Sequence, residues 1–129
     1  MKQKLFDCDV EIWTDGLGLW TSRKEPVRIT GVSIEYIDRI NSYVELDVHL
    51  DTTTWNTKEF GLIYTDRLFL KGLRQLLTSK GLDGDAIDYT EQGMQGDSYV
   101  SIEAGATFID TLANRFPTKF KCICEYYEK

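Results

Sequence analysis

Residues 58–81, KEFGLIYTDRLFLKGLRQLLTSKG, change from a strand pattern to a helix pattern within one residue. In residues 58–64 every second side chain is large and apolar or aromatic, which is typical of a half-buried strand. From Leu68 onward, Phe69 and a series of leucines recur with a 3.6-residue period, which predicts an amphipathic helix. The stretch therefore predicts a strand followed by a helix, both packed in one core.

The ends of this helix are marked by local signals. Thr65 and Asp66 are good N-cap residues, and Gly81 is a typical C-terminal stop, so we expect a helix over residues 67–80. Gly72 lies in its interior, where glycine costs about 1 kcal/mol relative to alanine. We interpret Gly72 as a point where the helix approaches the sheet closely.

The chain before this unit predicts strands. Residues 7–13 alternate, and residues 19–20 are a candidate short return strand after a glycine-rich turn. Residues 27–38 and 43–51 predict an antiparallel hairpin. In residues 27–38, Val27 and Ile29 occupy odd positions, whereas Val32, Ile34 and Tyr36 occupy even positions. The change occurs at Gly31. It predicts a β-bulge or bend there, because one extra residue exchanges the two faces of a strand.

The chain after this unit predicts a loop, two further strands, a helix and a final strand. Residues 81–97 are rich in glycine and acid and are the most loop-like part, with a short candidate strand at 86–90. Residues 99–103 predict a strand, and residues 106–116 an amphipathic helix that a proline ends. Residues 119–127 alternate again, so we expect the chain to end on a strand.

These elements predict one α+β domain spanning residues 1–129. We expect a largely antiparallel sheet of five to seven strands with two amphipathic helices on one face, in the order β-β-β-β-α-β-β-α-β. The strand–helix units 58–80 and 99–116 place the large apolar residues of their helices at corresponding positions, with a constant offset between the two units. This agreement follows either from a common packing demand or from an internal duplication.

Composition and charge limit the classes of function. The 129 residues are 42% hydrophobic and carry a formal net charge of −6, which indicates a folded chain and argues against a broad phosphate-binding surface. No apolar stretch is long enough for a membrane span, and the N-terminal residues lack the pattern of a signal peptide. Three cysteines (Cys8, Cys122 and Cys124) form an odd, sparse set, so we expect a cytoplasmic protein whose cysteines are small buried residues.

One arrangement of side chains is a candidate site. Alternate positions of strand 43–51 carry Tyr43, Glu45, Asp47, His49 and Asp51, and with Tyr36 these form the candidate binding face. Neighbouring residues on one face of a strand lie about 6.5 to 7 Å apart, so Asp47, His49 and Asp51 are the residues that a metal site would use. The alternative is a solvated outer face of an antiparallel sheet, on which ionisable residues are ordinary.

Other motifs carry no chemistry. The acidic run that begins at Asp83 departs from the EF-hand pattern, since Ile87 falls on a ligand position. No phosphate-binding glycine loop, nucleophile elbow or zinc spacing is present in the sequence. We therefore expect no cofactor.

Three hypotheses of function follow. The first is a small acidic, non-enzymatic binding or accessory protein, inhibitor-like or immunity-like, whose acidic and aromatic sheet face engages a basic protein partner. The second, from the class of enzymes, is a small metal-dependent hydrolase or metal-binding domain centred on Asp47, His49 and Asp51. The third is a self-associating structural subunit that forms a homodimer through an edge strand.

Overall fold

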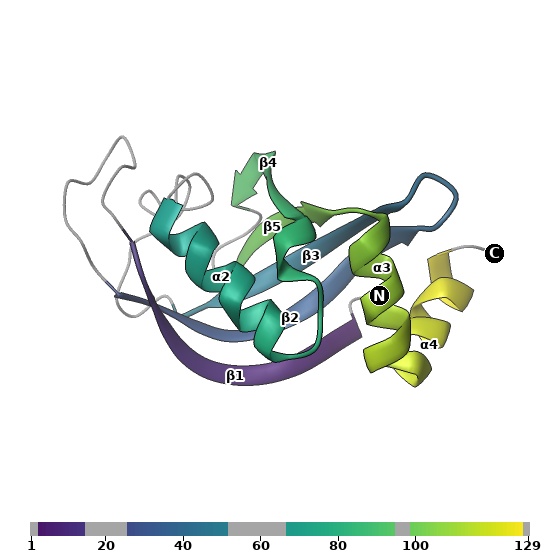
Figure 1. Cartoon of the computed structure of the whole chain (residues 1–129), viewed down its shortest axis with the longest axis horizontal. Coiled ribbons are helices and arrows are strands. Elements are labelled where there is room, and N and C mark those ends of the chain that lie inside the picture. The colour runs from purple at the N-terminus through teal and green to yellow at the C-terminus, as the bar shows by residue number, and fades with distance from the viewer. Residues whose placement is uncertain (1–2, 15–25, 52–66, 95–98, 128–129) are drawn as a thin grey trace.

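The computed structural model describes residues 3–14, 26–51, 67–94 and 99–127. In chain order the elements are β1 (Gln3–Trp13), β2 (Pro26–Asp38), β3 (Tyr43–Leu50), α2 (Arg67–Ser79), the 3-10 helix η2 (Gly84–Ala86), β4 (Ile87–Met94), β5 (Tyr99–Ala104), α3 (Ala106–Arg115) and α4 (Pro117–Tyr127). The strands form one curved sheet, and the helices lie against one of its faces (Figure 1). The predicted α+β class is confirmed.

The strands of the described residues form one sheet with the spatial order β1-β2-β3-β5-β4. Every neighbouring pair is antiparallel, as the sequence predicted. The predicted hairpin is present as β2 and β3. β5, from the C-terminal half of the chain, pairs along β3 from Val44 to His49, so β3 is the central strand of the sheet.

The register between β2 and β3 shifts at two points, between Ile29 and Gly31 and between Ile34 and Tyr36. The first shift confirms the bulge predicted at Gly31. The second was not predicted: the alternation placed Tyr36 on the same side as Ile34, but the shift moves Tyr36 to the opposite face and brings Ile37 into the core. Each shift inserts one unmatched residue, which exchanges the two faces of the strand.

A continuous apolar layer joins the sheet to the helices. β3 contributes Val44, Leu46, Val48 and Leu50; α2 contributes Phe69, Leu73 and Leu77; α3 contributes Phe108 and Leu112; and α4 contributes Ile123. All of these side chains are buried. Both predicted helices therefore pack on the side of the sheet to which the alternate residues of β3 point.

The C-terminal end of α2 has the geometry that its sequence predicted. Gly81 has φ = +85°, a value that glycine adopts without the steric cost that a Cβ would add. The backbone N–H of Gly81 donates to the carbonyl of Thr78, and that of Leu82 donates to the carbonyl of Leu77, at 3.0 and 3.1 Å. Because Leu77 and Leu82 are also buried, the helix ends in a Schellman motif that is joined to the core.

Gly72 lies where α2 crosses β1, and the predicted close approach is confirmed. A Cβ at this position would overlap the Cγ2 atom of Ile12 on β1. The absence of a side chain therefore lets the helix axis come close to the strand, which offsets the poor helix propensity of glycine.

The predicted final strand at residues 119–127 is wrong, because this segment is helix α4. Pro117 begins it, a position that accepts proline because the first N–H groups of a helix have no intrahelical partner. The alternation of apolar residues that suggested a strand coexists with a 3.6-residue pattern, in which Ile123 and Cys124 face the core and Phe120 and Tyr127 are half-buried. The predicted order of elements is corrected accordingly, since the described chain closes with two helices.

Other expectations have mixed outcomes. The loop predicted at 81–97 contains η2 and the strand β4, which is longer than the predicted strand at 86–90. The candidate strands at 19–20 and 58–64 and the N-caps Thr65 and Asp66 lie outside the described residues, so the suggested duplication stays a hypothesis. None of the described helices is long and apolar enough to cross a membrane.

Replacing Gly72 with alanine tests the contact with Ile12. We expect Gly72→Ala to lower the free energy of unfolding by about 1–2 kcal/mol, because overpacking outweighs the gain in helix propensity. In an Ile12→Ala background, where space has been made, the same substitution should raise stability by up to about 1 kcal/mol. Urea unfolding of the four proteins measures this change of sign; stabilisation by Gly72→Ala in both backgrounds would contradict the close approach.

Thiol reactivity tests the helical assignment of α4. Cys122 is exposed and Cys124 is buried, because residues two apart point to opposite sides of a helix, whereas a strand would place both on one face. Burial also raises the pKa of Cys8. We expect iodoacetamide to modify Cys122 at least about tenfold faster than Cys8 or Cys124. Mass spectrometry of the Cys122→Ser and Cys124→Ser variants separates modification at the two sites. Equal rates of modification at Cys122 and Cys124 would favour a strand over the helix α4.

Candidate functional site

The polar side chains predicted at alternate positions of β3, from Tyr43 to Asp51, form a polar row that divides into two environments. In the middle of the sheet, Asp47 is fully buried and His49 is half-buried. Towards the β2–β3 turn, Tyr43 and Glu45 are half-buried, and Tyr36 on the neighbouring strand is exposed. The alternative of a solvated outer face is therefore wrong at Asp47, whose side chain is fully buried.

A polar cluster surrounds Asp47. The Oγ atom of Ser33 lies 2.8 Å from Nε2 of His49, and Ser33 pairs with Asp47 across the β2–β3 ladder. The bulge at Gly31 places Ser33 on this face. The predicted row contains residues of β3 and Tyr36 and does not include Ser33; the parity change at Gly31 is the sequence signal that indicates its position.

A serine bonded to a histidine is the arrangement of an activated nucleophile and its base. Ser33 is however only 3% exposed, and a substrate carbonyl has to reach the nucleophile to within about 3–3.5 Å. In this conformation the cluster joins β2 to β3 inside the fold, and its geometry does not present a nucleophile to a substrate.

The metal hypothesis gains no support from the geometry. Within the ranges that the structure describes, no three His, Cys, Asp or Glu side chains are arranged to hold a metal ion. Asp51 follows the end of β3, where its backbone N–H donates to the carbonyl of Arg28. The hydrogen bond to Ser33 also occupies Nε2, one of the two ring nitrogens through which His49 could bind a metal.

Four tyrosines form a chain of aromatic contacts at the other end of the row. The ring centroids of Tyr36 and Tyr43 are 6.0 Å apart, those of Tyr36 and Tyr127 are 5.4 Å apart, and those of Tyr126 and Tyr127 are 4.7 Å apart. The hydroxyl of Tyr43 donates to Oε2 of Glu45 at 3.2 Å. Tyr36 and Tyr126 are 38% and 46% exposed. We call Tyr36, Tyr43, Glu45, Tyr126 and Tyr127 together the hairpin–α4 surface.

The lengths of the strands explain how this surface forms. The pairing of β1 with β2 ends at Gln3 and Ile34, so the last residues of β2 have no β1 neighbour. α4 packs against β2 and brings Tyr127 to Tyr36. The sequence identified Tyr36, Tyr43 and Glu45 but missed Tyr126 and Tyr127, because it assigned them to a strand.

The adjoining turn is held by Asp38. Its Oδ1 atom accepts the backbone N–H groups of Ile40 and Asn41 at 3.0 and 3.3 Å, and the Asn41 amide donates to Oδ2 at 2.6 Å. These hydrogen bonds, that of the Asn41 side chain first, lower the pKa of Asp38. The side chain of Ile40 is consequently presented at the tip, 93% exposed.

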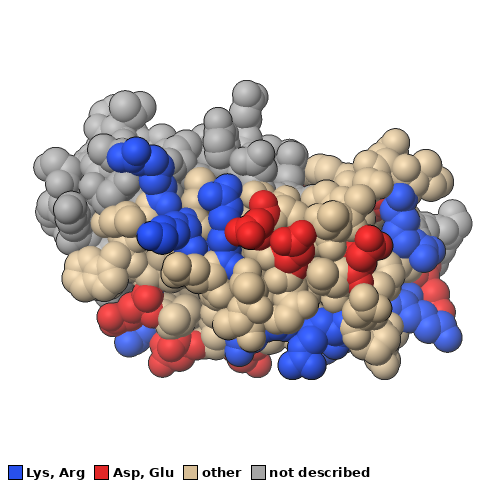
Figure 2. Space-filling view, in the orientation of Figure 1, with Lys and Arg blue, Asp and Glu red and all other residues tan. Residues whose placement is uncertain are grey.

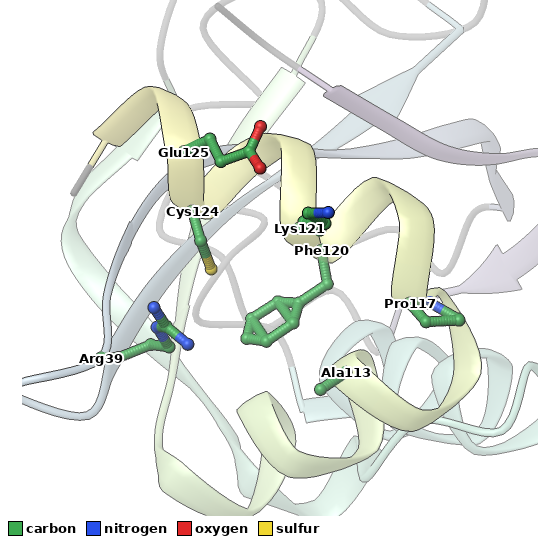
Figure 3. A pocket seen from close by; sticks show the side chains of 7 residues that line it. All are labelled: Arg39, Ala113, Pro117, Phe120, Lys121, Cys124 and Glu125. Carbon is green, nitrogen blue, oxygen red and sulfur yellow. The ribbon is translucent and has the colours of Figure 1, made fainter. Parts of the chain in front are cut away.

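A hollow of about 460 Å³ lies between the turn and helices α3 and α4, and Figure 3 shows the side chains that line it: Arg39, Ala113, Pro117, Phe120, Lys121, Cys124 and Glu125. The guanidinium carbon of Arg39 lies 5.7 Å from the centre of the Phe120 ring, a cation–π contact. Phe120 and Cys124 turn into the hollow (Figure 3). An apolar floor with charged groups at its margin is a typical receptor for one side chain of a partner.

Comparisons of the chain with protein-family models, curated proteins and solved structures found no match. The functional inference therefore depends on the chemistry of the hairpin–α4 surface and of the polar cluster around Asp47.

A serine-directed probe tests the enzymatic alternative. Because Ser33 is buried, we expect a fluorophosphonate to leave the folded protein unlabelled, as judged by intact mass. Labelling that disappears in Ser33→Ala would contradict this expectation and assign a nucleophile. We expect Ser33→Ala itself to cost about 1 kcal/mol of stability through the lost hydrogen bond to His49, measured by thermal unfolding.

Proposed function

We propose that the protein is a non-enzymatic binding or accessory domain, inhibitor-like or immunity-like, that engages a protein partner through the hairpin–α4 surface. The observation that supports this proposal most directly is the chain of four contacting tyrosines, of which Tyr36 and Tyr126 are substantially exposed. Tyrosine is enriched at the energetic centres of interfaces, because it buries a large rigid area and retains a polar tip.

The chemistry of the surface favours a basic partner. A lysine or arginine from the partner can lie on the face of Tyr36 while its charge approaches Glu45, whose carboxylate already accepts the hydroxyl of Tyr43. The hollow beside Phe120 can receive a neighbouring apolar side chain. The net charge of −6 assists the approach of such a partner.

The three cysteines are free thiols in the structure. This agrees with a reducing compartment, and we propose a cytoplasmic location for the protein. No cofactor enters the proposal, since its chemistry needs only side-chain contacts.

Substitution of the exposed tyrosines tests the proposed surface. We expect the double variant Tyr36→Ala/Tyr126→Ala to weaken binding to a protein captured from the native host by about 1–2 kcal/mol per anchor, or about 5- to 30-fold in Kd for each. Thr78→Ala, at an exposed position on α2 outside the hairpin–α4 surface, is the control and should leave that Kd unchanged.

Circular dichroism and thermal unfolding of the double variant establish that it is folded. Equal recovery of every captured protein by the wild type and the folded double variant would contradict the proposed surface. A crosslink from a photoreactive phenylalanine introduced at position 126 gives an independent readout, because it identifies a partner that contacts this position.

A further inference from the structure

We propose that the edge of β1 at residues 10–13, together with the adjoining groove against α2, binds an extended segment of a protein partner, which adds to the sheet as a further strand. This edge lies at the opposite end of the molecule from α4 (Figure 1). It is a second docking surface, independent of the function proposed for the hairpin–α4 surface.

The backbone of β1 specifies an extended occupant. Among the described strands β1 is the outermost, so no described strand pairs with its outward N–H and C=O groups. Residues 10–13 pair one by one with residues 26–29 of β2, which gives this stretch regular strand geometry. An added strand can satisfy such a row of backbone groups, whereas a helix cannot.

The remainder of β1 is protected against such addition. Its register shifts between Lys4 and Phe6 and again between Asp7 and Val10. The ammonium group of Lys119 on α4 donates to the carbonyl of Leu5 at 2.7 Å. Bulges and a covering side chain are common protections of an edge, so strand addition is confined to residues 10–13.

A groove beside this stretch can take a side chain of the added strand. It has a volume of about 490 Å³, and its apolar lining comes from Val10, Ile12, Trp13, Leu68 and Leu76. Trp13 is 56% exposed and Leu68 is 37% exposed, so two large apolar side chains flank the groove. Exposed apolar residues that gather at one place, rather than singly, mark interaction sites.

Charges on the two sides of the edge define the sequence that fits. α2 carries Arg67 and Lys71 and no acidic residue, and Lys71 borders the groove, whereas Arg74 is directed away from it and donates to the carbonyl of Ile87 at 3.4 Å. On the other face of β1, Arg28 is shared by Asp9 and Glu11 at 2.9 and 3.5 Å, which leaves one acidic charge in excess. Figure 2 shows basic side chains over the start of α2 and a mixture of acidic and basic ones along the lower rim.

Side chains of an added strand alternate between these two faces. The matching segment therefore carries apolar or acidic residues on the side of α2 and basic residues on the opposite side. A second copy of the chain is a poorer match, because symmetric pairing of two β1 strands brings their acidic rows alongside each other.

Peptide selection tests the proposal without a known partner. A displayed library of random peptides is selected against the whole protein, and recovered peptides are synthesised with and without backbone N-methylation. We expect the recovered peptides to alternate between the two kinds of side chain described above. Their binding should slow amide hydrogen exchange of the protein at residues 10–13 and shift the NMR resonances of these residues. N-methylation should abolish binding, because it removes the ladder donors.

Matched variants localise the binding. Trp13→Lys/Leu68→Lys should weaken the Kd of a recovered peptide at least about tenfold, whereas Ile40→Lys, an equivalent change at the distant turn, should leave it unchanged. The absence of any recovered peptide that perturbs residues 10–13, or binding that survives N-methylation, would overturn the proposal. Sedimentation showing a dimer of the free protein that Trp13→Lys dissociates would also overturn it, by assigning the edge to a second copy.

Discussion

The rest of the structure depends on one constraint, which is that the large apolar side chains of β2 must face the helices along the whole strand. Two register shifts keep Ile29, Ile34 and Ile37 directed towards the helices, although no single alternation along the strand would do so. Without the shifts, part of β2 would expose these isoleucines and bury polar residues, at a cost of several kcal/mol. The same shifts determine which polar side chains reach the opposite face.

The two environments on the face opposite the helices follow from these shifts. The first shift, at Gly31, places Ser33 opposite Asp47 and within hydrogen-bond distance of His49. The second directs Tyr36 outward, where the end of β1 leaves room for α4. One side of the sheet thus holds a buried polar cluster near its centre and a partly exposed aromatic surface at the turn.

The described surface is polarised along the long axis of the molecule. The hairpin–α4 surface, at one end, is built from aromatic side chains and a carboxylate, which suit a folded partner with a basic residue. The edge of β1, at the other end, offers backbone groups and an apolar groove, which suit an extended chain. Because the two surfaces differ in chemistry, the two proposals call for different classes of partner and are tested separately.

Local interactions account for what the sequence by itself determined. The α+β class, the β2–β3 hairpin, the bulge at Gly31, the C-terminal stop of α2 at Gly81 and the close approach at Gly72 all follow from periodicity and from the backbone preferences of single residues. The alternation along β3 places Tyr43 and Glu45 on the polar face for the same reason, whereas the outward position of Tyr36 depends on the second register shift. Only the tertiary structure decided that residues 117–127 form a helix, since their apolar residues fit both periods until packing against β2 selects one. It alone decided that Asp47 is buried and that Tyr126 and Tyr127 complete the aromatic surface, because burial and contact depend on segments that are distant in the chain.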